Sequence, residues 1–279
     1  MKRPKGLHGP PRETTYQEAV KSLPRFNFYK RISSYPIIKW LLNPIWSPRH
    51  WEVTAVPINV EITSPDTVSV PRNIMERLIQ KVVDDIFLMD TCYCRKVFKH
   101  KEEYADIGCM VFGSGAKRIH PSHGRFVSKQ EALEHVRKAA RAGLVADVAW
   151  VWVDPSTWGT HPFDEQLFVC FCDDKCFYRG SMHKRGPNLN KTYMKLPGSS
   201  VKVDSAKCDG CGACLEACFV AEMKIRDKVA TPGKDCKVCG RCAEVCPVQA
   251  IEICFDDEDA IFRDFMKRIN ARTRVTSND

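Results

Sequence analysis

The sequence CDGCGACLEAC occupies residues 208–218, and CKVCGRCAEVCP occupies residues 236–247. Both stretches have the spacing C-x2-C-x2-C-x3-C, so the chain contains one short cysteine pattern twice. An internal repeat of this kind indicates one small structural unit that is used in two copies. We expect this unit to form a C-terminal domain over residues 200–256.

The spacing within each copy suits a cysteine-bound cluster. Three cysteines at intervals of three residues can converge from one tight turn onto a single small cluster. The fourth cysteine follows where the chain enters a short helix, and in the two-cluster arrangement it binds the other cluster. The expected ligands of the first 4Fe-4S cluster are Cys208, Cys211, Cys214 and Cys246, and those of the second are Cys236, Cys239, Cys242 and Cys218.

Residues 202–255 resemble the bacterial-type two-cluster 4Fe-4S ferredoxin domain. Cys246-Pro247 and the following Val-Gln-Ala-Ile match the C-P-x-x-A-I of that family, whereas Phe219 stands where the first copy would carry proline. The resemblance implies a carrier of single electrons. The alternative is that the eight cysteines bind two zinc ions, but zinc sites rarely have three evenly spaced cysteines and a fourth.

Composition places the chain among ordinary globular proteins. It has 279 residues, of which 15 are cysteine, 44% are hydrophobic and 28% are charged. No apolar run approaches the ~18 residues of a membrane-spanning helix, and the first residues lack the apolar core of a secretory signal. We therefore expect a cytoplasmic chain, in which a reducing environment favours metal-binding thiolates over disulfides.

Six further cysteines lie upstream of the repeat, in two groups. In extended chain a C-x-C pair directs both thiols to one side, so two such pairs are able to supply four ligands to one site. We expect Arg95 and Lys175 to favour the thiolate form of these cysteines. The candidate ligands are Cys92, Cys94, Cys170 and Cys172, with Cys109 and Cys176 as substitutes.

Three interpretations of the upstream thiols remain open. They hold a third iron–sulfur cluster, or a structural zinc ion with His100 or His183, or they are unliganded cysteines or a redox dithiol. The region also resembles ferredoxin-fused bacterial proteins with a C-x-C-R element, a Gly-Cys-x-x-x-G element and a second cysteine cluster, which implies electron transfer to a partner. The matching stretches are Cys92 to Arg95, Gly108 to Gly113, Ser128 to Val145 and Cys170 to Cys176.

The start of the chain is basic and aromatic. Residues 1–50 hold ten Lys and Arg against two Glu, within a formal net charge of +9. Residues 1–15 offer no apolar period and are predicted to be flexible. Residues 16–51 interleave basic and aromatic side chains, so this segment either wraps the first domain or docks on an acidic redox partner or an anionic membrane surface. Nucleic acid is not an expected partner.

An α/β-like domain is expected over residues 16–180, which makes the whole chain α+β. A strand is predicted within residues 52–63, and Pro57 favours an edge position for it, because proline has no amide donor. Residues 181–199 are predicted to be a linker and residues 257–279 a polar tail or helix. The other predicted elements are a helix from Pro71 with Ile74, Leu78, Val82 and Ile86 on one face, a helix from Ser128 with an S-x-x-E capping box, and a buried strand at 144–154.

The function expected from these features is one-electron transfer to or from a partner oxidoreductase. A second hypothesis makes the upstream domain an enzyme, in which a cysteine-bound metal reduces a small molecule and the ferredoxin part supplies the electrons. A third makes the chain a redox-sensing or assembly protein. An electron carrier requires fully ligated clusters, whereas an enzyme requires an open metal position.

Overall fold

The computed structural model describes residues 13–42, 47–63, 68–69, 72–83, 85–160, 162–180 and 182–277. Most of the predicted flexible start, residues 1–15, and the predicted helix start at Pro71 lie outside these ranges. Within them the chain combines helices and sheets, so the α+β class is confirmed at this level.

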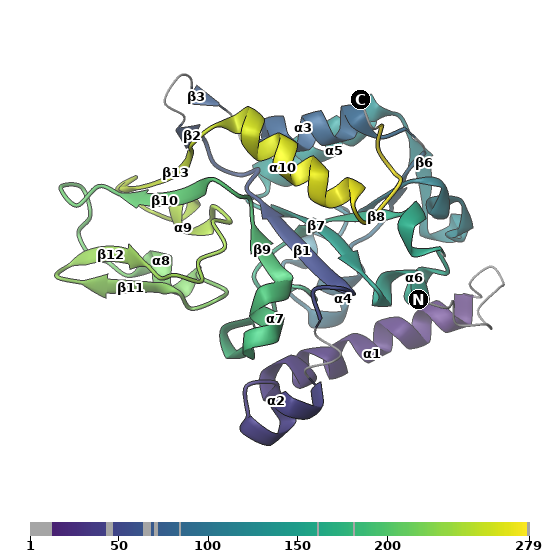
Figure 1. Cartoon of the computed structure of the whole chain (residues 1–279), viewed down its shortest axis with the longest axis horizontal. Helices are drawn as coiled ribbons and strands as arrows, with labels where there is room; N and C mark the ends of the chain where they lie inside the picture. Colours follow the sequence, from purple (N-terminus) through teal and green to yellow (C-terminus); the bar gives the residue numbers. More distant parts are fainter. Residues whose placement is uncertain are drawn as a thin grey trace.

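A seven-stranded sheet forms the centre of the molecule, in the order β6-β4-β5-β8-β7-β1-β9 (Figure 1). Five of its six pairings are antiparallel, and β1 and β9 run parallel. The strands are β1 (Trp51–Val56), β4 (Ile86–Met89), β5 (Met110–Phe112), β6 (Gly124–Val127), β7 (Val145–Val151), β8 (Leu167–Cys172) and β9 (Tyr193–Lys195).

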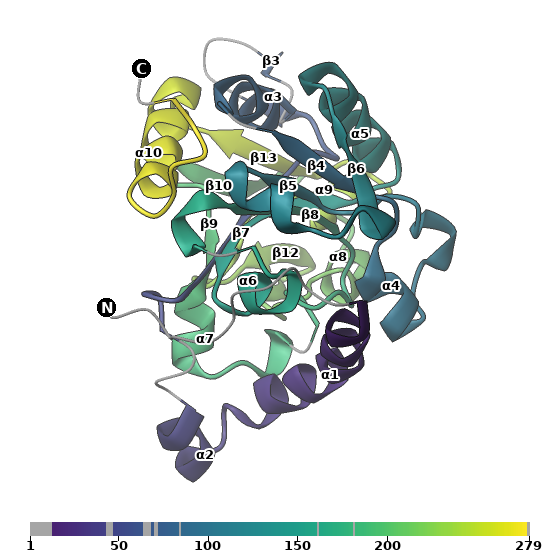
Figure 2. The same ribbon diagram turned by 90° about the vertical axis from the view of Figure 1, so that its right-hand side faces the viewer.

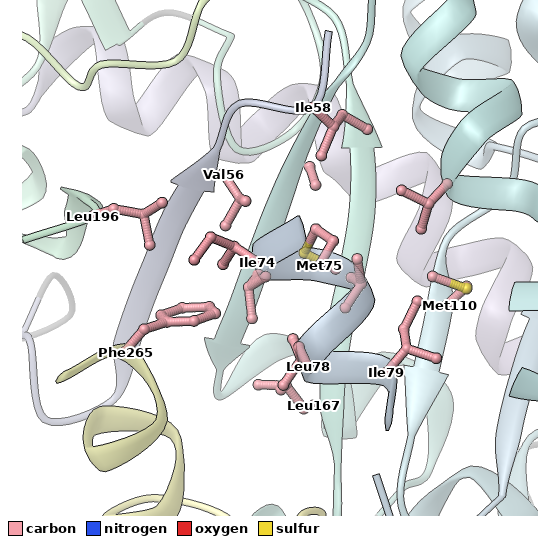
Figure 3. Close-up of a cluster of buried hydrophobic side chains, with 14 of the residues drawn as sticks. Val56, Ile58, Ile74, Met75, Leu78, Ile79, Met110, Leu167, Leu196 and Phe265 are labelled. Carbon is pink, nitrogen blue, oxygen red and sulfur yellow. The ribbon is translucent and has the colours of Figure 1, made fainter. Parts of the chain in front are cut away.

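Helices cover both faces of this sheet (Figure 2). One face packs against α3 (Arg72–Lys81), α5 (Lys129–Arg141) and α10 (Glu258–Asn270), and Figure 3 shows part of the resulting core. There, Ile74 and Leu78 of α3 and Phe265 of α10 meet Val56 and Leu167 of the sheet. The other face packs against α1 (Glu13–Ile32), α4 (Tyr93–Phe98), α6 (Val153–Trp158) and α7 (Pro187–Thr192). The thiols of β8 lie on this second face.

The cysteine repeat folds beside the sheet and shares structure with the rest of the chain. Its strand β13 pairs with β10 on one side and runs parallel to β2 of the N-terminal part on the other. Ion pairs also join the repeat to the rest of the chain. Arg241 pairs with Asp174 at 3.1 Å, and Glu222 pairs with Arg185 at 3.0 Å. The elements concerned are β2 (Ile62–Thr63), β3 (Val68–Ser69), β10 (Ser199–Val203), α8 (Ala213–Glu216), β11 (Met223–Arg226), β12 (Val229–Pro232), α9 (Arg241–Glu244) and β13 (Ile251–Phe255).

Two segments are more fully built into the fold than their sequences predict. Residues 181–199, expected to be a linker, contain α7 and β9, and β9 completes the central sheet. Residues 257–279, expected to be a polar tail or helix, contain α10, whose apolar face is buried in the first core. The buried side chains of α10 are Ile261, Phe262, Phe265, Met266 and Ile269.

The local predictions upstream have mixed outcomes. The capping box at Ser128 is confirmed, because its hydroxyl accepts from the Glu131 amide and the Glu131 carboxylate accepts from the Ser128 amide. The edge position of the first strand is wrong, since β1 lies between β7 and β9 and ends before Pro57. The helix with Ile74 and Leu78 ends at Lys81, and Ile86 belongs to β4.

The basic, aromatic start forms two helices with different environments. Lys30 of α1 is fully buried, and Phe26 packs edge-on against Phe177 at 5.7 Å between ring centroids. In α2 (Pro36–Leu42) no side chain is buried. In the described parts of the chain, no helix has both the length and the apolar character that a bilayer span requires.

Candidate metal centres

The first group of repeat cysteines surrounds Cys214. Burial raises the pKa of the Cys214 thiol, and the nearby Cys208, Cys211 and Cys246 raise it further. Cys214 therefore lies close to the three other cysteines expected to bind the first cluster. The structure brings them together, and their role as ligands stays a prediction.

The second group forms around Cys236, Cys239 and Cys242. Burial raises the pKa of Cys236 to about 11, with further increases from Cys239 and Cys218. Burial also raises the pKa of Cys242, and the charges of the same neighbours and of Cys214 add to it. Cys218 thus belongs to the first copy of the repeat in sequence and lies with the second copy in space. The effect of Cys214 on Cys242 places the two groups next to each other.

Backbone amides point at the sulfurs of these groups. Such N–H···S contacts are expected at a negatively charged sulfur site, whose reduction potential they tune. Turns with left-handed backbone direct three of these amides, because Ala221, Val238 and Gln249 have positive φ angles of 55°, 50° and 49°. The donors and acceptors are Glu222 to Cys218 (3.3 Å), Ala230 to Cys208 (3.4 Å), Val238 to Cys236 (3.4 Å) and Ala250 to Cys246 (3.3 Å).

The two groups differ in their surroundings. Cys211 of the first group is exposed to solvent. The second group faces the N-terminal part, where the buried Phe219 packs against Tyr193 of β9 at 5.1 Å between centroids. The guanidinium of Arg179 stacks on the Phe219 ring, 4.1 Å from its centroid. The residue that replaces proline in the first copy therefore docks the repeat on the sheet.

All six upstream cysteines line one cavity of about 70 Å³ beneath the second face of the sheet. Cys170 and Cys172 lie two apart on β8 and therefore share a face, as the C-x-C argument predicts. The first pair is different, because Cys92 precedes α4 and Cys94 lies in its first turn rather than in extended chain. The cavity is lined both by the cysteines expected as main ligands and by those expected as substitutes: Cys92, Cys94, Cys109, Cys170, Cys172 and Cys176.

The thiols around the cavity contact one another. A hydrogen bond with Cys109 lowers the pKa of Cys92 to about 6, and the Arg95 guanidinium contributes. Cys109 also contacts Cys170, and its own pKa rises because of these hydrogen bonds. At the other end Cys172 and Cys176 approach within 4.8 Å of each other and of an Asp147 oxygen. Burial, followed by the charges of neighbouring thiols, raises the pKa of Cys94.

Buried cations surround these thiols. Arg95 is 1% exposed and donates from Nη1 to the carbonyls of Tyr104 (3.1 Å) and Ile107 (3.0 Å) and from Nη2 to that of Phe171. Lys30 donates to the Phe177 carbonyl, and burial lowers its pKa to about 8 while nearby thiols oppose that effect. The side chain of Lys175, expected to favour thiolates, is instead exposed.

Sequence reasoning missed a polar pair on the wall of the cavity. The Tyr178 hydroxyl donates to Asp154 Oδ2 at 2.6 Å, and both side chains are buried. Burial raises the pKa of Asp154 to about 7. Little in the sequence points to this pair. Asp154 follows a buried strand and Tyr178 follows a cysteine group, but neither residue belongs to a recognisable motif.

The histidines proposed as zinc ligands lie elsewhere. His100 Nδ1 contacts Asp173 at 3.3 Å, and neither His100 nor His183 is among the residues that line the cavity. His123 Nδ1 forms a hydrogen bond with the Tyr93 hydroxyl at 2.9 Å, so it supports a wall residue of the cavity rather than providing a ligand.

Residues 234–252 match the family described as Fer4, the 4Fe-4S binding domain. This stretch contains the second copy of the cysteine pattern, so the C-terminal part of the chain contains a ferredoxin-type iron–sulfur domain. No curated protein and no solved structure matches the chain.

Proposed function

We propose that the chain is an iron–sulfur electron-transfer protein that carries single electrons through two 4Fe-4S clusters to or from a partner oxidoreductase. The observation that carries the proposal is the exchange of cysteines between the two copies. Cys218 lies with the second copy, and Cys246 lies with the first. This exchange is the arrangement expected of a two-cluster ferredoxin, and the family match supports the iron–sulfur chemistry.

The residues around the two groups suit electron transfer. A thiolate-bound 4Fe-4S cluster supplies a one-electron couple when it is bound. The amides that point at Cys208, Cys218, Cys236 and Cys246 stabilise added negative charge on sulfur without any movement of the chain. Because the groups are adjacent, the domain provides a short route between its two ends.

The exposed end of the ferredoxin domain is the proposed docking surface for the redox partner. Cys211 is exposed there. Leu215 and Val248, which follow cysteines of the first group in the sequence, are 38% and 36% exposed. Exposed apolar side chains around a cluster ligand favour close approach of a partner protein, and the rate of electron transfer depends on that approach.

A separate surface on α2 is proposed to contact an anionic membrane. Ile37 and Trp40 are 78% and 77% exposed, which is unusual for large apolar side chains. Lys21, Arg25 and Arg31 of the adjoining α1 are exposed as well. An apolar patch with neighbouring basic residues is the pattern of peripheral membrane segments.

The test of the electron-transfer proposal is the cluster content of the full chain purified without oxygen. The two clusters of the ferredoxin domain contribute about eight irons and as many sulfides per chain. We expect Cys214→Ser and Cys242→Ser each to impair one cluster and to change the EPR spectrum of the reduced protein. The buried Cys254→Ser is the matched control and should retain the wild-type iron content. Two zinc ions per chain, or iron content and spectra that neither ligand variant alters, would overturn the proposal.

A further inference from the structure

The six upstream cysteines come from segments far apart in the sequence and still converge on one cavity. The central sheet achieves this, because β4, β5 and β8 are consecutive strands in its order. Cys92 follows β4, Cys109 precedes β5, and Cys170 lies on β8. These six thiols are separate from the eight cysteines expected to bind the ferredoxin clusters, and they gather six sulfur donors around one space. Soft thiolate donors are the ligands of Cu(I), Zn and iron–sulfur clusters.

The size of the cavity favours a cluster over a single metal ion. A water molecule needs roughly 10–15 Å³ of such space, so a cavity of about 70 Å³ has room for several atoms. A structural zinc site instead draws four donors to about 2.3 Å from one ion, which leaves no such space between them. The histidines that would complete a zinc site do not line the cavity.

The walls of the cavity suit an anionic inorganic group. Most of the lining is apolar or aromatic and includes Phe168, Trp158 and Phe177. Lys30 and Arg95 are 0% and 1% exposed and lie beside the thiols, where they are able to offset negative charge. An apolar cavity that is lined by cysteines and flanked by buried cations offers the sulfur donors and the offsetting charge that an iron–sulfur cluster needs.

We propose that this cavity binds a third iron–sulfur cluster of at least four irons, held by thiolates drawn from its six cysteines. The cluster exchanges single electrons with the ferredoxin domain. In that step the ferredoxin domain is oxidised by one electron and the upstream cluster is reduced by one, and no bond or proton moves. The electron-exchange part rests on the proposed function, whereas the metal site stands on its own geometry.

One set of buried side chains connects the cavity with the second ferredoxin group. Asp147, within 4.8 Å of Cys172 and Cys176, lies 3.9 Å from Arg179 Nε. Arg179 in turn stacks on Phe219, the residue next to Cys218. The charge of Cys239 also acts on Arg179. Asp147, Arg179 and Phe219 thus form a buried path between the sulfurs of the cavity and Cys218.

The experiment compares three forms of the full chain, all purified without oxygen and analysed for iron, sulfide and zinc. The first is the wild type. The second, C92S/C94S/C170S, leaves three cavity thiols, which is fewer than a four-iron cluster needs. The third, C211S/C214S/C239S/C242S, removes two expected ligands from each ferredoxin cluster and leaves the cavity intact. C254S is the control for loss of a buried cysteine.

We expect about twelve irons in the wild type and in C254S, about eight in the cavity variant and about four in the ferredoxin variant. Reduced wild type should show an EPR signal that the cavity variant lacks and the ferredoxin variant retains. Iron retained by the ferredoxin variant supports the cavity site whatever happens at the other cysteines, so failure of the proposed function would be recognised separately. Should either variant fail to fold, the wild-type count decides. About eight irons, with or without one zinc, overturns the third cluster.

Discussion

Arg95 and Asp173 each directly follow a C-x-C pair, and the two side chains form an ion pair with 3.4 Å between Nε and Oδ2. Both are nearly inaccessible, with 1% and 2% of the side chain exposed. The pair therefore connects the segment after Cys94 with the segment after Cys172. The arginine of the C-x-C-R element holds two walls of the cavity together, in addition to its effect on the thiols.

Removal of Arg95 should destabilise the protein strongly. Arg95→Met leaves Asp173 buried without its guanidinium partner and takes one donor away from each of three carbonyls, so we expect a loss of about 3–5 kcal/mol in unfolding free energy. The double variant Arg95→Met/Asp173→Leu should lose less than the sum of the two single variants. Chemical denaturation of all four proteins gives the comparison, and strictly additive losses would contradict a coupled pair.

Phe219 should contribute to stability through its contacts with the sheet. Phe219→Ala removes a buried ring from Arg179 and Tyr193, and we expect a loss of about 3–5 kcal/mol. Leu215→Ala is the control within the same motif, because Leu215 is 38% exposed, and it should cost well under half as much. Denaturant unfolding measures both. Equal losses would mean that the ring does not dock the repeat.

The two equivalent glycines of the repeat should respond differently to a methyl group. Gly212 and Gly240 both have φ of 84°. A Cβ at Gly212 would meet nothing within 4 Å, whereas at Gly240 it would lie 2.9 Å from Val60 and 3.2 Å from Pro57. Gly212→Ala should therefore cost only the left-handed backbone, about 1–2 kcal/mol, and Gly240→Ala roughly 1–3 kcal/mol more. Thermal or denaturant unfolding should rank them in this order, and the reverse order would refute the packing argument.

His135 should make the protein less stable as the solution becomes acidic. Burial lowers the pKa of His135 below its ordinary value, and Nε2 donates to the Gly108 carbonyl at 2.9 Å. As the pH falls through the unfolded-state pKa of about 6.5, the unfolded chain gains a proton that the folded chain does not, so folding stability decreases. This contribution is absent above that pKa and grows below it.

The variant His135→Gln keeps a donor for Gly108 and removes the titration. Its stability should fall less than that of the wild type between pH 7.5 and pH 5.5, a window set about one unit on each side of the unfolded pKa. The exposed His120→Gln is the control and should follow the wild type. Identical slopes for wild type and His135→Gln would show that the buried imidazole does not contribute.

The exposed face of α2 should determine membrane binding. The double variant Ile37→Ser/Trp40→Ser removes two apolar side chains that make no buried contact. We expect unchanged stability, within about 0.5 kcal/mol, and a clear loss of co-sedimentation with vesicles rich in anionic lipid. Neutral vesicles provide the baseline for both proteins. Binding that is equal for variant and wild type would exclude this surface as the contact.

Short-range features of the fold were predictable because their causes lie within a few residues. The capping box at Ser128 needs only the Glu131 side chain three residues later. The spacing of the repeat likewise brings Cys208, Cys211 and Cys214 together within one turn. By contrast, the edge position suggested by Pro57 was wrong. The pairing of β1 with β9 joins residues about 140 positions apart, and no local pattern encodes such a pairing.

The cavity was only partly predictable for the same reason. The two C-x-C pairs identify the chemistry, but a choice of four ligands among six cysteines requires the order of strands in the sheet. Lys30 could not be assigned a role from its neighbours, because its contact with Phe177 spans 147 residues. The burial of α10 was missed although Ile261, Phe265 and Ile269 recur at intervals of four, because the charged residues between them made the segment look polar.

The position of α1 imposes an order on maturation. Leu23 of this helix forms part of the cavity wall, and Lys30 is buried against the turn that carries Cys176 and Phe177. Because α1 covers part of the cavity, the proposed cluster would enter most readily before this helix docks. Newly made chains should accordingly pass through a stage in which the sheet is formed, the thiols are accessible and the first helix is still detached.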